Sequence, residues 1–106
     1  MQTYTVLVFQ DPNEPTFWIG CVPAIPAAMS QGDSFEHALE MTQEALELVL
    51  EHDLEQGQTL PTDSMNLEQA MIETRERFEL SAETTLHQAR LSIGVSVQTR
   101  EVNVAA

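Results

Sequence analysis

The side chains that most often carry chemistry are few and widely spaced in this sequence. The three histidines, His37, His52 and His87, form no HxxxH pair, and Cys21 is the single cysteine. Protein metal sites usually draw on closely spaced ligands, such as HxxxH or CxxC pairs. Cys21 lies in an apolar stretch without a neighbour that would lower the pKa of its thiol, as a reactive cysteine requires. We therefore predict no metal site and a packing role for Cys21.

Carboxylates are abundant, with 17 Asp and Glu against four Arg and no Lys. Two carboxylates can catalyse hydrolysis where a cleft drives their pKa values apart. Here many of them follow one face of a predicted helix, which is typical of a solvated surface or a docking surface. The sequence contains no GxSxG, Walker or GxGxxG motif. We predict that the chain is not an enzyme and has neither catalytic residues nor a cofactor.

Charge and length restrict the partners and the compartment. The formal net charge of −13 repels phosphate backbones, so we predict no direct nucleic-acid binding and an attraction to basic proteins. A single cysteine forms no internal disulfide and fits a reducing compartment. The N-terminus does not resemble a signal peptide, and no window approaches the roughly 20 apolar residues of a membrane span. These features predict one compact cytoplasmic domain of 106 residues without membrane contact.

Three strands are predicted before the first helix. Residues 4–9 and 16–22 are rich in aromatic and β-branched residues and are separated by a proline-containing loop, which indicates a hairpin. Apolar groups on both faces of 4–9 predict a strand that is covered on both sides. Gly20 marks either a bulge or a point of close approach. A short third strand fits residues 27–30.

A long amphipathic helix is the clearest local pattern. Asp33 or Ser34 can cap it, Asp33 and Glu36 have the spacing of a capping box, and Gly57 is a natural C-terminal stop. Asp53 falls on the apolar arc, which predicts that the helix is ending there. The apolar arc contains Phe35, Ala38, Leu39, Thr42, Ala45, Leu46, Val49 and Leu50. The acidic arc contains Glu36, Glu40, Glu44, Glu47, Glu51 and Glu55.

A second helix and a final strand follow. The helix is predicted to begin near Asp63 or Ser64, and apolar residues alternate from Leu91 to Val97 as in a half-buried strand. The alternation changes phase at residues 102–104, which fits a tight turn or a bulge equally well.

Together these elements predict an α+β fold. A small antiparallel sheet of three to four strands packs on one long helix in the order βββαβ, with an additional inserted helix before the C-terminal strand. Residues 1–61 form the core, 62–88 the inserted helical segment, and 89–106 the C-terminal strand. That strand either completes the sheet or forms an interface in a homo-oligomer, a dimer or a tetramer.

Short motifs then carry a resemblance. Val22-Pro23-Ala24-Ile25-Pro26, Gln31-Gly32-Asp33-Ser34 and Glu44-Ala45-Leu46-Glu47 follow one another as strand return, helix start and helix. In this order, over residues 4–61, the sequence resembles the HicB family of antitoxins. The resemblance implies a degenerate ribonuclease-H-like fold without catalytic acids. It also implies a partner, a basic RNA-cleaving toxin like HicA, whose active surface the antitoxin covers.

The sequence departs from the family pattern in three places. Ala27 and Ala28 replace the usual Gly-Cys after the return, and an insertion of about 30 residues follows Pro61. No basic DNA-reading helix follows residue 80, where Arg90 and Arg100 are the only Arg or Lys residues. Operator binding by this chain is therefore not expected.

The candidate partner surface lies on the acidic side of the long helix. We expect its glutamates to attract a basic toxin and two apolar side chains beside them to make the dry contact. The six residues are Glu40, Met41, Glu44, Glu47, Leu48 and Glu51. Two alternatives stay open: a merely solvated helix face, and a stand-alone homo-oligomeric structural or regulatory protein of the same fold without a toxin.

Overall fold

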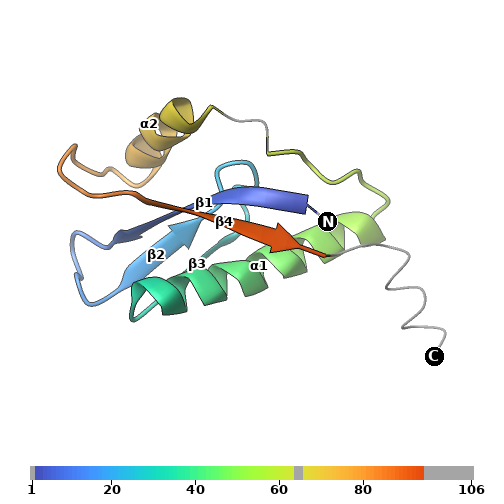
Figure 1. The fold of residues 1–106 in the computed structure, drawn as a ribbon, viewed down its shortest axis with the longest axis horizontal. Helices are drawn as coiled ribbons and strands as arrows, with labels where there is room; N and C mark the ends of the chain where they lie inside the picture. Colours follow the sequence, from blue (N-terminus) through green and yellow to red (C-terminus); the bar gives the residue numbers. More distant parts are fainter. Residues whose placement is uncertain (1, 64–65, 95–106) are drawn as a thin grey trace.

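The computed structural model describes residues 2–63 and 66–94. Its elements, in chain order, are β1 (Gln2–Gln10), β2 (Trp18–Cys21), β3 (Met29–Gly32), α1 (Phe35–Glu55), α2 (Leu67–Arg77) and β4 (His87–Ile93). The strands form one sheet in the order β3-β2-β1-β4, and every neighbouring pair is antiparallel. The predicted α+β fold is confirmed, with α1 on one side of the sheet and α2 on the other (Figure 1).

The central strand β1 is covered on both faces, as its sequence predicts. Tyr4, Val6 and Val8 point towards α1 and belong to the larger core. Leu7 and Phe9 point to the opposite face and belong to a smaller core. All five side chains are fully buried. The sheet therefore separates two hydrophobic cores, and only the larger one contains the long helix.

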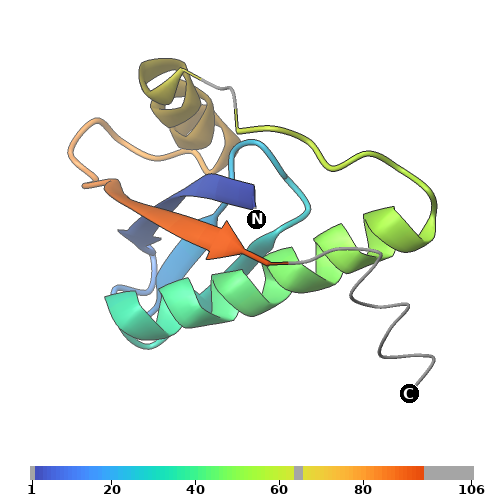
Figure 2. The ribbon, with the colours of Figure 1, turned by 45° about the vertical axis from the view of Figure 1, so that its right-hand side comes forward.

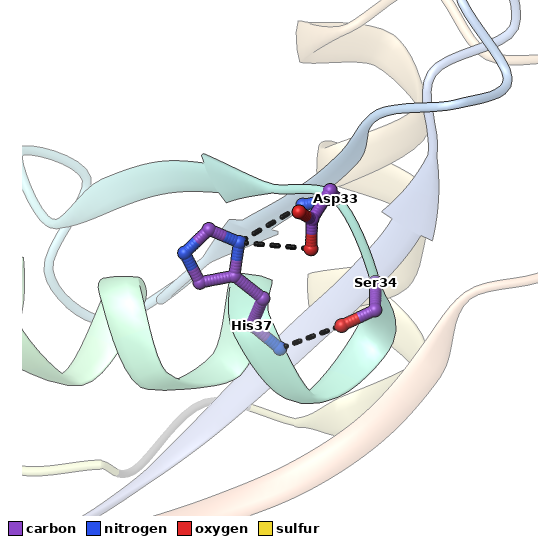
Figure 3. Close-up of polar contacts among 3 residues, drawn as sticks. All are labelled: Asp33, Ser34 and His37. Atoms are coloured by element: carbon purple, nitrogen blue, oxygen red, sulfur yellow. Dashed lines mark hydrogen bonds and ion pairs between the residues drawn. The ribbon is translucent and has the colours of Figure 1, made fainter.

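The N-terminus of α1 is capped by Ser34, whose Oγ accepts a hydrogen bond from the His37 backbone N–H at 3.1 Å. Asp33 lies one residue too early to cap the helix and instead contacts Nδ1 of His37 at 3.1 Å (Figure 3). The residue three positions after the cap is therefore His37, and the predicted box between Asp33 and Glu36 does not form.

The C-terminus of α1 lies two residues beyond Asp53, so the prediction that the helix is ending at this residue, with Gly57 as its stop, is confirmed. The helix continues to Glu55, and Gly57 follows with a φ of 77°. The Gln58 N–H donates to the Asp53 carbonyl, and the Gly57 N–H donates to the Leu54 carbonyl. This pair of bonds is a Schellman motif, in which glycine supplies the left-handed residue.

The inserted helix α2 begins at Leu67 and not at Asp63 or Ser64. Asn66 is its cap, with Oδ1 accepting a hydrogen bond from the Gln69 N–H at 3.1 Å. Asp63 instead accepts a hydrogen bond from the Thr5 hydroxyl at 2.8 Å, which binds the interhelical segment to β1. The α2 side of the sheet includes a ring contact between Phe9 and Phe78, with centroids 5.3 Å apart.

The last described strand, β4, begins at His87, four residues before the predicted start at Leu91. Its pairing with β1 explains the difference, because the ladder runs from the Val8–His87 pair to the Gln2–Ile93 pair. Among the strands of the described residues, β4 forms one edge of the sheet. The predicted change of phase at residues 102–104 lies outside the described residues, and the division into segments 1–61, 62–88 and 89–106 stays a prediction.

Candidate functional site

The six predicted partner residues share the side of α1 that faces away from the sheet. At 100° per residue they fall within a sector of roughly 120°. Glu40, Glu44 and Leu48 are exposed, and the other three side chains are half-buried. We call this set, Glu40, Met41, Glu44, Glu47, Leu48 and Glu51, the α1 patch. Figure 2 shows that the helix carrying it lies along one flank of the molecule, opposite α2.

Leu48 is the apolar centre of the α1 patch. Its side chain is 67% exposed, the most exposed of the large hydrophobic residues in the described part of the chain. Glu44, Glu47, Leu48 and Glu51 line a shallow depression of about 500 Å³. A lysine or arginine from a partner could lay its aliphatic stem on Leu48 while its charge reaches the surrounding carboxylates. This arrangement suits recognition of a basic surface.

The described cations lie elsewhere and serve internal contacts. The Arg75 guanidinium donates to the carbonyls of Ser81 and Thr84 at 2.7 and 2.8 Å. Arg77 donates to the Pro26 carbonyl at 3.0 Å. Arg90 lies 3.9 Å from Asp63. Within residues 2–63 and 66–94, no ion pair neutralises Glu40, Glu44 or Glu47. These three glutamates of the α1 patch therefore keep their negative charge available to a partner.

Cys21 and the three histidines are not brought together. Cys21 is buried, and burial raises the pKa of its thiol above the ordinary value, an effect that Thr74 and Arg77 only partly oppose. His37 contacts Asp33 at the start of α1, His52 lies in the last turn of α1, and His87 begins β4. In the described part of the chain, no group of three or more His, Cys, Asp and Glu side chains could hold a metal ion.

The sequence did not predict a polar cluster near the start of β1. The buried Tyr4 hydroxyl donates to the Pro61 carbonyl at 2.6 Å, and Thr5 contacts Asp63 on the same segment. Burial raises the pKa of Tyr4, and the nearby carboxylates of Asp63 and Asp53 raise it further. These contacts join residues 57 and 58 positions apart, a separation at which no periodicity gives a signal. The cluster holds the segment between the helices against the sheet.

Three rings also meet at the other end of β1 without a sequence signal. Trp18, Phe35 and His87 have centroids 5.6 to 6.1 Å apart. They come from β2, α1 and β4, and Trp18 and Phe35 pack against the larger core. The rings contact one another directly, so they close this end of the core and leave no space between them for a ligand.

Comparison with known proteins supplies the family. A sequence model described as the HicB-like antitoxin of bacterial toxin–antitoxin systems matches residues 4–104. The N-terminal domain of the Burkholderia pseudomallei antitoxin HicB is a similar solved structure. It is 21% identical, with a TM-score of 0.64, and the match covers 89% of this chain and 100% of that one. The B. pseudomallei antitoxin HicB is also similar, at 17% identity and a TM-score of 0.59, covering 99% of this chain and 82% of that one.

The search of curated proteins returned no match. No helix in residues 2–63 and 66–94 is long and apolar enough to cross a membrane. At 17% and 21% identity the two solved structures support the likeness of fold alone. The match to the family model supports membership of the family as well as the fold. It spans nearly the whole chain and includes the segment after residue 61 that the motifs did not cover. The chain therefore belongs to the HicB-like antitoxin family of bacterial toxin–antitoxin systems.

Proposed function

We propose that this chain binds and masks a small, basic, RNA-cleaving toxin like HicA, without catalysing a reaction itself. The observation that carries the proposal is the α1 patch, where the exposed Leu48 lies in a depression lined by Glu44, Glu47 and Glu51. A protein that grips RNA needs a basic surface to neutralise phosphates. The α1 patch offers that surface a set of carboxylates and, at its centre, the apolar side chain of Leu48, which would exclude water from the contact.

The charge of the chain supports the same proposal through association kinetics. A net charge of −13 accelerates the approach of a basic partner, and the acceleration falls as salt screens the charges. Carboxylates on the α1 patch would also fix the orientation of the toxin. An RNA-cleaving toxin acts in the cytoplasm, so the proposal places this chain there. The ribonuclease-H-like ancestry is part of the same proposal and rests on the motifs between residues 22 and 47.

The test compares two triple charge reversals that change the net charge equally. One, Glu40→Lys, Glu44→Lys and Glu47→Lys, alters the α1 patch. The matched control, Glu68→Lys, Glu73→Lys and Glu76→Lys, alters exposed glutamates of α2. Binding to the small basic protein encoded by a neighbouring reading frame is measured by calorimetry at several salt concentrations.

We expect the α1 variant to lose at least 100-fold in affinity and most of the salt dependence, and the α2 variant to lose less than about ten-fold. Equal losses in the two variants would show that only the overall charge matters and would remove the α1 patch from the proposal. Unchanged binding in both would contradict the electrostatic mechanism.

A second candidate is a stand-alone homo-oligomer, which the position of β4 favours. Within residues 2–63 and 66–94, β4 has seven residues and forms an edge of the sheet, while the opposite edge strand β3 has four. An edge strand offers unpaired backbone groups that a second copy can pair with across a two-fold axis. Light scattering on the chain alone measures the mass. A stable dimer or tetramer, together with the absence of a neighbouring toxin frame, would favour this candidate over the antitoxin.

A further inference from the structure

The face of the sheet opposite α1 carries a small core that α2 covers. Leu7, Phe9, Cys21 and Leu86 are buried there, and Met71 and Phe78 from the α2 region pack against them. α2 itself contributes little buried surface. Of its eleven residues only Ala70 and Thr74 are buried, and both have small side chains. The cover is therefore held by much less apolar contact than α1.

α2 is also too short to be stable alone. Isolated helices of fewer than about 12 to 15 residues are marginal in water, so α2 depends on its packing. That packing is incomplete, because a cavity of about 360 Å³ separates α2 from the return that follows β2. Cys21, Pro23 and Pro26 line one side of the cavity, and Thr74 and Arg77 line the other.

The C-terminus of α2 carries backbone strain that the C-terminus of α1 avoids. Both ends form Schellman motifs, and in α2 the Leu80 N–H donates to the Arg75 carbonyl and the Glu79 N–H to the Glu76 carbonyl. The left-handed residue is Gly57 after α1 but Glu79, at a φ of 53°, after α2. A residue with a β-carbon is disfavoured in this conformation.

Few polar contacts tie α2 to the sheet side of the cavity. Arg77 donates to the Pro26 carbonyl at 3.0 Å, and its guanidinium also lies 3.7 Å from the Met29 sulfur. Arg75 bonds only within its own region, to the carbonyls of Ser81 and Thr84. The polar contacts that fasten α2 to the sheet side are therefore few, chiefly Arg77 to the Pro26 carbonyl and Thr74 to the Cys21 thiol.

We propose that α2 is a displaceable cover, which swings off this face of the sheet while the sheet and α1 stay folded. The larger core lies on the other side of the sheet and contains none of the α2 residues, so it does not need the cover. Displacement exposes Leu7, Phe9 and the Cys21 thiol to solvent. The proposal is independent of toxin binding through the α1 patch.

Cys21 provides the test, because it is the single cysteine and only 2% exposed. The rate at which a fluorescent maleimide labels the folded protein at neutral pH measures how often the thiol becomes accessible. We expect labelling to require only local opening. The labelling rate should therefore rise far less steeply with urea concentration than the equilibrium constant for global unfolding does. Labelling that follows the urea dependence of global unfolding would overturn the proposal.

Three variants identify the opening element. Arg77→Ala removes the tie to Pro26 and should accelerate labelling about five-fold. Glu79→Gly relieves the strain and should slow labelling about five-fold. Gly57→Ala, the matched change at the end of α1, lowers global stability but should leave the labelling rate in water unchanged. Circular dichroism establishes that each variant is folded.

Reagent size excludes entry through the cavity. A small thiosulfonate and a bulky maleimide should respond to Arg77→Ala and Glu79→Gly by the same factor if α2 moves. Rapid labelling by the small reagent alone, unaffected by either variant, would show that reagents reach Cys21 through the cavity and would contradict displacement of α2.

Discussion

Gly20 of β2 lies directly beneath Thr42 of α1, with no room for a β-carbon between them. The Thr42 hydroxyl donates to the Ala38 carbonyl at 2.7 Å, so its position is set within the helix. The strand register continues regularly through Gly20, which pairs with Val8 on one side and Ser30 on the other. Of the two roles that the sequence allowed for Gly20, close approach is therefore correct.

Replacing Gly20 by alanine should lower the free energy of unfolding by about 1–3 kcal/mol, because the new methyl group pushes α1 away from the sheet. Urea denaturation followed by circular dichroism measures the change. Gly94→Ala is the control, since a β-carbon there meets no atom within 4 Å. It should change stability by less than about 0.5 kcal/mol. Equal effects of the two substitutions would contradict the close approach.

The contact between Gly20 and Thr42 also predicts a rescue. In a Gly20→Ala, Thr42→Ala double variant the Thr42 hydroxyl that blocks the new methyl group is gone. The double variant should therefore be more stable than the sum of the single effects implies, by about 1 kcal/mol or more. Gly32→Ala should not be rescued in this way, because its β-carbon would meet the backbone of His37 and Ala38. Additive effects at Gly20 and Thr42 would show that they do not interact.

Gly57 ends α1 in the left-handed conformation, with a φ of 77° and open space around its α-carbon. Gly57→Ala should therefore cost only the conformational penalty, about 1 kcal/mol of unfolding free energy. Thermal denaturation detects a loss of this size as a lower melting temperature. An unchanged melting temperature would show that the helix end adapts to a residue with a β-carbon.

Tyr4 predicts a loss of stability at alkaline pH. Its pKa is raised by burial and by the carboxylates of Asp63 and Asp53, so deprotonation is harder in the folded state than in the unfolded state. The contribution of the protonated Tyr4 hydroxyl to the free energy of unfolding is complete below the ordinary tyrosine pKa of about 10. It is lost as the pH rises through the higher pKa of the folded state. The urea midpoint should therefore fall above about pH 10.

A tyrosine-free variant isolates this effect. Tyr4→Phe removes the chain's single tyrosine, and it should be less stable at pH 7 by about 1 kcal/mol because the bond to the Pro61 carbonyl is lost. Its midpoint should then fall less than that of the parent above pH 10. Both proteins need a Cys21→Ala background, because burial raises the pKa of that thiol too. Parallel pH profiles would assign the alkaline loss to other groups.

Local patterns predicted most of the fold but not its long-range polar contacts. The alternation in β1 and the apolar arc of α1 both follow from burial of one face. Residues on one face recur at every second position of a strand and about every 3.6 positions of a helix. The cap was ambiguous because Asp33 and Ser34 both have side-chain oxygens, and only the path of the chain places Ser34 correctly. Asp53 indicated correctly that the helix is ending, because it lies in the last turn of α1, half-buried near Tyr4.

The candidate site was predictable in position for the same reason, since helical periodicity places Glu44 and Leu48 on one face. The depression around Leu48 and the internal contacts of the arginines were not predictable, because they depend on side-chain conformations and, for the arginines, on contacts up to 85 residues apart. The start of α2 was misplaced because a long-range bond to Thr5 holds Asp63 outside the helix.

Leu48 gives the sharpest separation of binding from stability. Because its side chain is 67% exposed, Leu48→Gln removes little buried surface and should change the free energy of unfolding by less than about 0.5 kcal/mol. If Leu48 is the dry centre of the toxin contact, the same change should weaken toxin binding about ten-fold or more, as truncation of a buried interface anchor does. Ile72→Gln on α2 is the matched control, since Ile72 is 48% exposed and lies outside the α1 patch. Both variants keep the net charge, so an affinity loss confined to Leu48→Gln would locate the contact on α1 without any electrostatic contribution. Equal losses, or a loss only in Ile72→Gln, would move the toxin contact away from the α1 patch.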